Sequence, residues 1–80
     1  MECMVIPLVR LKAGGKAKVL SLQADGAVRR RMLDLGLIEG TQVVSLYRSP
    51  SGNPMAYMIR GAVIALRADV AKSILVEECL

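Results

Sequence analysis

The chain is a succession of short extended segments separated by residues that form turns. The segments, rich in β-branched and aliphatic side chains, are residues 8–11, 16–22, 41–48, 55–60, 62–67 and 74–76. Glycine and proline interrupt them, most clearly in residues 49–54, where two prolines accompany a glycine and an asparagine. Short strands at such close intervals, with little helix between them, predict a mainly β protein that forms a small, partly open barrel.

Residues 26–35 contain the clearest helical pattern. Val28, Met32 and Leu35 recur at i, i+4 and i+7, so they are expected to share the helix face that packs on the barrel. Arg29 and Arg30 fall largely on the other side. A run of basic residues in this position is usually a solvated helix face, and that interpretation is kept beside any functional one.

Both ends of this helix have recognisable signals. Asp25 is suited to the N-cap, because its carboxylate can accept a hydrogen bond from the first free amides of the helix. Gly36 suits the left-handed residue that closes many helices, and Leu37 beyond it is expected to contact Met32 in a Schellman cap. A second helical pattern, in residues 68–73, is long enough only for a short helical turn.

The chain length and composition predict one domain, residues 1–80, with one compact core. With 80 residues, 54% of them apolar, the chain is expected to fold around aliphatic side chains, because aromatic residues make up only 2%. There is no histidine, which removes the commonest general base and the commonest metal ligand at neutral pH. An enzyme is therefore not expected, and no catalytic residues are predicted.

The apolar runs are short, and the longest fall far below the roughly 20 residues that a membrane-spanning helix needs. Glu2 stands where a signal peptide would carry positive charge, so a cytoplasmic location is expected. The formal net charge of +4 favours acidic partners. A barrel that binds nucleic acid is the weakest alternative, because only Tyr47 and Tyr57 are available to stack bases.

Cys3 and Cys79 lie near opposite ends of the chain. A disulfide would require the two ends to meet, so two free thiols in a reducing compartment are the expectation. Terminal strands of small barrels often run side by side, which leaves open a metal shared by the two cysteines, with Glu77 and Glu78 as further ligands. No cofactor is required, and without histidine any such metal site must be weak or shared with another molecule.

Residues 31–37 (RMLDLGL), followed by Gly40 and Thr41, resemble the signature of the FeoA family. The resemblance extends in order through residues 11–14, the 49–54 loop, the step from Arg60 to Gly61, and residues 65–67. It implies an SH3-like, partly open β-barrel with one short α-helix and a short helical turn. The same domain also forms the C-terminal part of some iron-dependent repressors, but no DNA-binding helix-turn-helix precedes it here, so the stand-alone form is expected.

This resemblance implies a small cytoplasmic accessory or regulatory protein of bacterial ferrous iron uptake. Its partner would be FeoB, the membrane transporter with a cytoplasmic G-protein domain, reached by protein–protein contact. The repressor relatives suggest a second function, a metal-sensing module that binds ferrous iron, manganese or zinc. Self-association through open strand edges is compatible with either function.

A partner surface can be proposed next to the helix. Leu35, Leu37 and Ile38 would supply an apolar anchor, and Arg29 and Arg30 would supply a cationic rim, a normal composition for a protein interface. The alternative is that Leu35 and Leu37 are simply core and cap residues.

Overall fold

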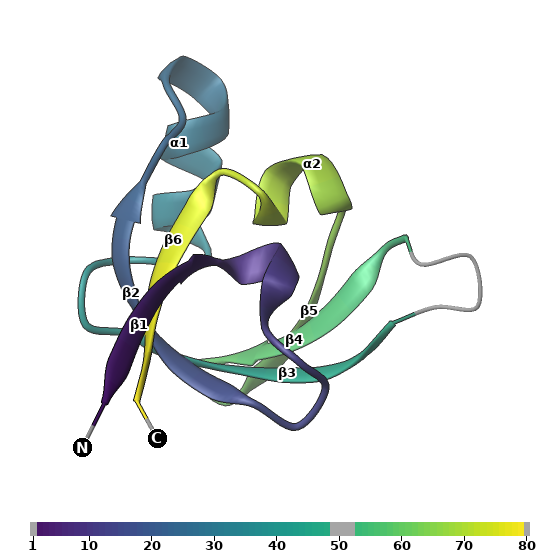
Figure 1. Cartoon of the computed structure of the whole chain (residues 1–80). Coiled ribbons are helices and arrows are strands. Elements are labelled where there is room, and N and C mark those ends of the chain that lie inside the picture. The colour runs from purple at the N-terminus through teal and green to yellow at the C-terminus, as the bar shows by residue number, and fades with distance from the viewer. Residues whose placement is uncertain (1, 49–52, 80) are drawn as a thin grey trace.

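The computed structural model describes residues 2–48 and 53–79. In this part of the chain six strands form one antiparallel sheet in the order β1-β6-β2-β3-β4-β5. The sheet curves strongly around a core, and the helices cover one end of it (Figure 1). Strands β1 and β5 are the two edges of the sheet, so the barrel is open, as the sequence predicted.

From β2 to α2 the element boundaries agree with the sequence to within a residue or two, whereas β1 was not predicted and β6 extends three residues beyond the predicted segment. In chain order the elements are β1 (Cys3–Pro7), the 3-10 helix η1 (Leu8–Arg10), β2 (Lys16–Leu22), α1 (Gly26–Asp34), β3 (Gln42–Arg48), β4 (Met55–Ile59), β5 (Ala62–Leu66), α2 (Ala68–Ala71) and β6 (Ile74–Cys79). No helix in these described residues is long and apolar enough to cross a membrane. The predicted loop between β3 and β4 lies largely outside the described residues.

The start of the chain differs from the prediction. Residues 8–11 were expected to be extended, but Leu8–Arg10 forms a 3-10 turn closed by a hydrogen bond of 3.0 Å from the amide of Leu11 to the carbonyl of Leu8. The turn buries both leucines in the core. Local apolar composition could not distinguish this turn from a strand, because burial rather than β-pairing determines its shape.

The first and last strands pair directly. Strand β6 lies between β1 and β2, and the antiparallel register of β1 and β6 places Cys3 opposite Cys79. The first and last strands therefore bring the two termini to the same corner of the sheet (Figure 1). The sequence had left open that the terminal strands run side by side, and strand β1 itself was not predicted; the structure shows that it forms and pairs with β6.

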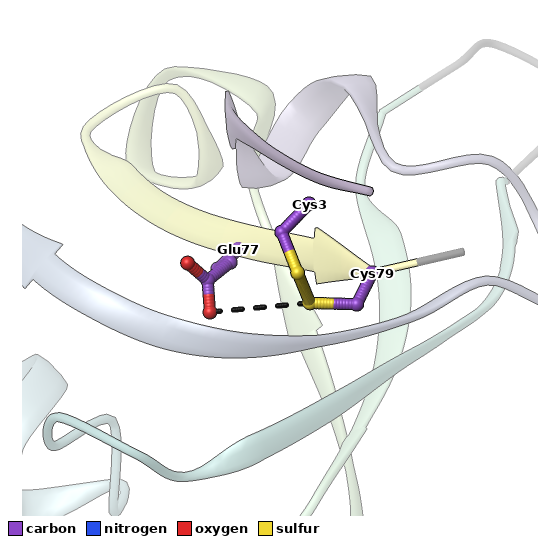
Figure 2. Close-up of side chains that lie close together, drawn as sticks. All are labelled: Cys3, Glu77 and Cys79. Atoms are coloured by element: carbon purple, nitrogen blue, oxygen red, sulfur yellow. Dashed lines mark hydrogen bonds between the residues drawn. A yellow bond between two sulfur atoms is a disulfide. The ribbon is translucent and has the colours of Figure 1, made fainter. Parts of the chain in front are cut away.

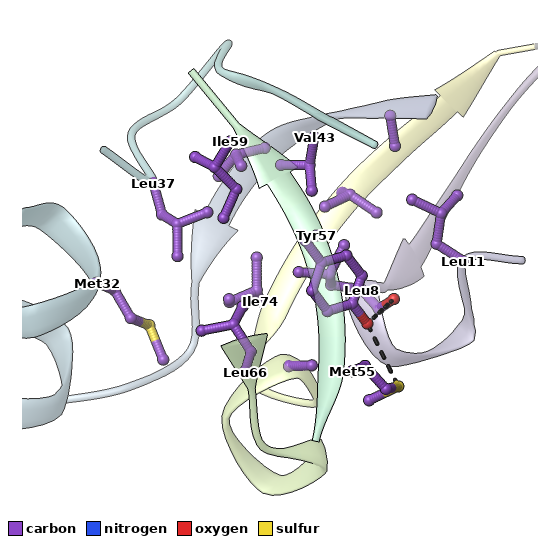
Figure 3. Packing of buried hydrophobic residues seen from close by; sticks show 14 residues of the cluster. Leu8, Leu11, Met32, Leu37, Val43, Met55, Tyr57, Ile59, Leu66 and Ile74 are labelled. Carbon is purple, nitrogen blue, oxygen red and sulfur yellow. Dashed lines mark hydrogen bonds between the residues drawn. The ribbon is translucent and has the colours of Figure 1, made fainter. Parts of the chain in front are cut away.

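The core is aliphatic, as expected, apart from one buried tyrosine (Figure 3). Tyr57 is completely buried, and its hydroxyl donates a hydrogen bond of 3.4 Å to the carbonyl of Leu8. Tyr57 pairs with Ser45 across the β3–β4 ladder, whereas Tyr47 pairs with Ala56 and is exposed. The two tyrosines therefore do not form a pair, and only Tyr47 is accessible to a base.

The C-terminal cap of α1 is the one predicted from the sequence. Gly36 has a φ of +93°, and the amide of Leu37 donates to the carbonyl of Met32 at 3.0 Å. The amide of Gly36 donates to the carbonyl of Leu33 at the same distance, which completes the Schellman pattern. Asp25 occupies the N-cap position with extended backbone, but its side chain makes no capping hydrogen bond, so that part of the prediction was wrong.

Candidate partner surface and metal-ligand cluster

Helix α1 and the loop after it carry the residues that the sequence placed at a partner surface. Arg29 and Arg30 are exposed, Ile38 is 48% exposed and Leu35 is half-buried. Leu37 is different, because its side chain is 0% exposed. The Schellman cap turns the chain back toward the barrel at this point, so Leu37 is a core residue and cannot contribute to a partner surface.

The packing face of α1 covers the barrel incompletely. Val28 was predicted to pack, yet it is 48% exposed, whereas Met32 on the same face is 1% exposed. A hollow of about 290 Å³ lies beside the Met32 contact; its lining residues are Val28, Arg31, Met32, Leu35, Ala65, Leu66, Arg67 and Val70. We call this hollow, between α1 and the corner formed by β5 and α2, the α1 groove.

The α1 groove has an apolar floor and a basic border. Its lining combines aliphatic residues from both sides with two basic residues, Arg31 and Arg67. Arg67 also lies 3.8 Å from a carboxylate oxygen of Asp69, but both side chains are exposed, so this ion pair contributes little. Arg67 and Val70 were missed by sequence analysis, because they reach the groove from a helical turn more than 30 residues away in the chain.

The residues of the family signature meet at the end of α1. A β-carbon on Gly36 would lie 2.6 Å from Cδ of Arg60, so the glycine leaves room for the arginine side chain. Arg60 and Gly61 both have positive φ, 52° and 83°, and form the tight turn between β4 and β5. The turn of the β4–β5 hairpin therefore lies next to the end of the helix.

A cluster of three side chains, Cys3, Glu77 and Cys79, lies at the corner of the sheet where β1 begins and β6 ends, which we call the terminal corner (Figure 2). Cys3 and Cys79 form a disulfide with an S–S distance of 2.09 Å and a Cα–Cα distance of 4.0 Å. The expectation of free thiols was therefore wrong for this structure, since the register of β1 and β6 brings the two ends together. Oε1 of Glu77 lies 4.0 Å from Sγ of Cys79.

Three of the four predicted metal ligands are brought together. The ligand atoms of Cys3, Glu77 and Cys79 all lie within 4.8 Å of one another. Glu78 does not belong to this cluster. Side chains alternate along β6, so Glu78 projects to the same side of the strand as buried Val76. In the disulfide form the sulfurs are not thiolates, so the cluster as it stands offers only the Glu77 carboxylate as a strong ligand.

Two lysines adjoin this cluster. Lys18 lies opposite Glu77 in the β2–β6 ladder, and it lines a hollow of about 350 Å³ together with Lys16, Ala17, Gln42, Glu77 and Cys79. Both lysines are exposed, as the alternation of β2 predicted. The surroundings of Glu77 are therefore basic.

The described residues thus form a small open barrel that offers two exposed features, an apolar groove with arginines and a cysteine–carboxylate cluster. A family model for the FeoA domain matches residues 6–78, and the chain belongs to the FeoA family. The family predicted from residues 31–37 is confirmed.

Solved structures support both the family and the fold. The solution structure of FeoA from Chlorobium tepidum is 37% identical, with a TM-score of 0.87 over 94% of this chain and 71% of that chain. FeoA from Stenotrophomonas maltophilia, described as a procaryotic SH3 domain protein complexed with zinc, is 30% identical, with a TM-score of 0.79 over 94% and 95% of the two chains. The SH3-like fold is therefore confirmed.

One curated relative extends the comparison to a transporter. It is the Fe(2+) transport protein A/Fe(2+) transporter FeoB fusion protein of Porphyromonas gingivalis, 29% identical over 70 residues. The match covers 88% of this chain but spans only 8% of the length of that relative. A manganese-dependent transcriptional repressor, 19% identical with a TM-score of 0.85, shares the fold over 44% of its length.

Proposed function

We propose that this chain is a small cytoplasmic accessory and regulatory protein of bacterial ferrous iron uptake that acts by contact with an FeoB transporter. The fusion protein of Porphyromonas gingivalis carries this proposal, because it joins a transport protein A region and FeoB in one chain. Covalent linkage keeps two modules at high effective concentration and is favourable where they work together. A separate chain of the same family would have to achieve that proximity through a binding surface.

The α1 groove is the surface that we assign to this contact. It offers an apolar floor beside Arg31 and Arg67, and the exposed Arg29 and Arg30 extend the basic border along the helix. An apolar centre with a cationic rim suits an acidic segment of the transporter that presents one or two aliphatic side chains. Of the residues named from the sequence, Arg29, Arg30, Leu35 and Ile38 remain in this proposal, and Leu37 does not.

The test is calorimetric binding of the full chain to the cytoplasmic domain of the cognate FeoB, with and without a GTP analogue. Val28→Asp places a charge in the groove and is expected to weaken binding by about tenfold or more. Val63→Asp is the matched control, because Val63 is 61% exposed on the edge strand β5 and does not line the groove. Equal affinity of the two variants would reject the groove as the contact surface.

Sedimentation of the chain alone belongs to the same experiment. Strands β1 and β5 are the open edges of the sheet, and unpaired strand edges favour association between copies. Dimers would alter the apparent stoichiometry with the transporter domain. The calorimetric titrations are therefore made at concentrations where the chain sediments as a single species.

A second candidate function is metal sensing, which the cluster of Cys3, Glu77 and Cys79 favours. In this function, binding of ferrous iron, manganese or zinc would change the affinity for the transporter. The calorimetric titration repeated with reduced chain and each ion in excess tests it. Affinities that do not change with any of the three ions would reject sensing while leaving the contact itself intact.

A further inference from the structure

We infer that Cys3, Glu77 and Cys79 form a binding site for a thiophilic divalent metal ion, and that this site exists only when the disulfide is reduced. The ion expected to bind best is zinc, with ferrous iron as the competing ion of the same class. The inference deepens the metal-sensing candidate by naming its site, but it does not depend on any contact with the transporter.

The backbone holds the three ligands whether or not the sulfurs are bonded. Strands β1 and β6 are paired over five residue pairs, so their register does not rely on the covalent link. Directly opposed residues of antiparallel strands project to the same side of the sheet. Glu77 lies two residues before Cys79 and therefore projects to that side as well.

The spacing suits a single ion. Zinc binds thiolate at about 2.3 Å, so two thiolates on one tetrahedral ion lie about 3.8 Å apart. The Cα atoms of Cys3 and Cys79 are 4.0 Å apart, and rotation of the two side chains is enough to separate the sulfurs once their bond is broken. With Glu77 as the third ligand, the fourth position is open to water or to a ligand from another molecule.

The charges of the cluster select its ligand. Two thiolates and one carboxylate are softer than the oxygen sets that bind magnesium or calcium, and they favour zinc and ferrous iron. A divalent ion on three anionic ligands leaves a net charge of −1, which Lys18, opposite Glu77, is placed to offset. Both cysteines are exposed, so a reductant and an ion can reach the sulfurs.

The chemistry requires an external dithiol, either a small molecule or a protein. Its thiolate attacks one sulfur of the Cys3–Cys79 bond, its second thiol resolves the mixed disulfide, and it leaves as an oxidised disulfide. Cys3 and Cys79 gain the two electrons and two protons as thiols. Binding of a divalent ion then releases those two protons. Transfer of two electrons to a disulfide oxidant would re-form the bond and expel the ion.

The test is anaerobic titration of the full chain with Co²⁺, a spectroscopic substitute for zinc. Reduced chain, freed of reductant by gel filtration, is expected to bind one ion per chain and to show thiolate-to-cobalt charge-transfer absorption, which added Zn²⁺ abolishes. Oxidised chain is expected to show no such absorption. Circular dichroism of both forms checks that reduction leaves the fold intact.

Variants identify the ligands. Cys3→Ser is expected to abolish the charge-transfer band of the two-thiolate site, and Glu77→Gln is expected to weaken binding by about tenfold or more. Glu78→Gln is the matched control, because it removes the same charge from the neighbouring residue on the other side of β6, and its affinity is expected to equal that of the unmodified chain.

Three results would overturn the inference: no charge-transfer band in folded, reduced chain, equal cobalt affinity of reduced and oxidised chain, or equal loss in Glu77→Gln and Glu78→Gln. No transporter is present in this titration. A negative result here therefore leaves the proposed FeoB contact untouched, and failure of that contact leaves the metal site untouched.

Discussion

Helix α1 and the terminal corner are attached to the barrel in contrasting ways. The helix is anchored through one buried side chain of its own, Met32, and leaves the α1 groove beside the anchor. The corner is held by five residue pairs between β1 and β6 and by the Cys3–Cys79 bond. The helix thus offers surface that another protein can cover, whereas the corner offers ligands that the chain itself has assembled.

The difference reflects the distance along the chain between the interacting residues. The end of α1 is built by hydrogen bonds between residues three to five positions apart, such as those from Gly36 and Leu37. The corner joins residues separated by 76 positions. Local hydrogen bonds form at small entropic cost, whereas closing a long loop must be compensated by pairing and burial elsewhere.

The largest predicted change in the free energy of unfolding comes from a comparison of Leu37 and Ile38, two neighbours in the loop after α1. Leu37→Asp buries a charge in the core and is expected to lower the free energy of unfolding by about 4 kcal/mol or more. Ile38→Asp, at an exposed position, is expected to change it by less than about 0.5 kcal/mol. Urea unfolding followed by circular dichroism measures both. Equal losses would mean that the loop is not divided into a core side and a surface side.

Reduction of the disulfide is expected to have the next largest effect on stability. Cross-linking of residues 76 positions apart restricts the unfolded chain, and its loss should lower the free energy of unfolding by about 2–4 kcal/mol. Urea midpoints of oxidised and reduced chain provide the comparison. In the reduced chain, Zn²⁺ is expected to restore part of this loss, since an ion that binds only the folded form stabilises it. No change on reduction would contradict the expected stabilisation through restriction of the unfolded chain.

A smaller effect tests the contact at the end of the helix. Gly36→Ala is expected to cost about 1–2 kcal/mol for the left-handed backbone, with an added cost for displacing Arg60. Gly14→Ala is the matched control, because Gly14 has a φ of +85° and a β-carbon there would meet no described atom within 4 Å. Urea unfolding measures the free energy of unfolding that each variant loses. The difference between the two losses gives the contribution of the Arg60 contact. If both variants lose the same stability, Arg60 does not help to hold the helix end.

The sequence predicted best those features that neighbouring residues decide. The strand from residue 16 to residue 22 and the Schellman cap at Gly36 follow from alternation and from local backbone preference, and both are confirmed. Val28 lies on the helix face that the sequence predicted, beside the groove, but it is 48% exposed and not packed as expected. Periodicity identifies the face that points toward the barrel, but it does not report how closely the barrel approaches that face.

The amino-acid sequence was therefore enough to predict the mainly β architecture, helix α1 with its C-terminal cap, and the family. The three-dimensional arrangement was needed to show that Leu37 is buried, that Arg67 borders the α1 groove, and that Cys3 meets Cys79 beside Glu77 and not Glu78. This division arises because backbone preference and side-chain alternation act between near neighbours. Burial, grooves and ligand clusters depend on which distant segments the curved sheet brings into contact.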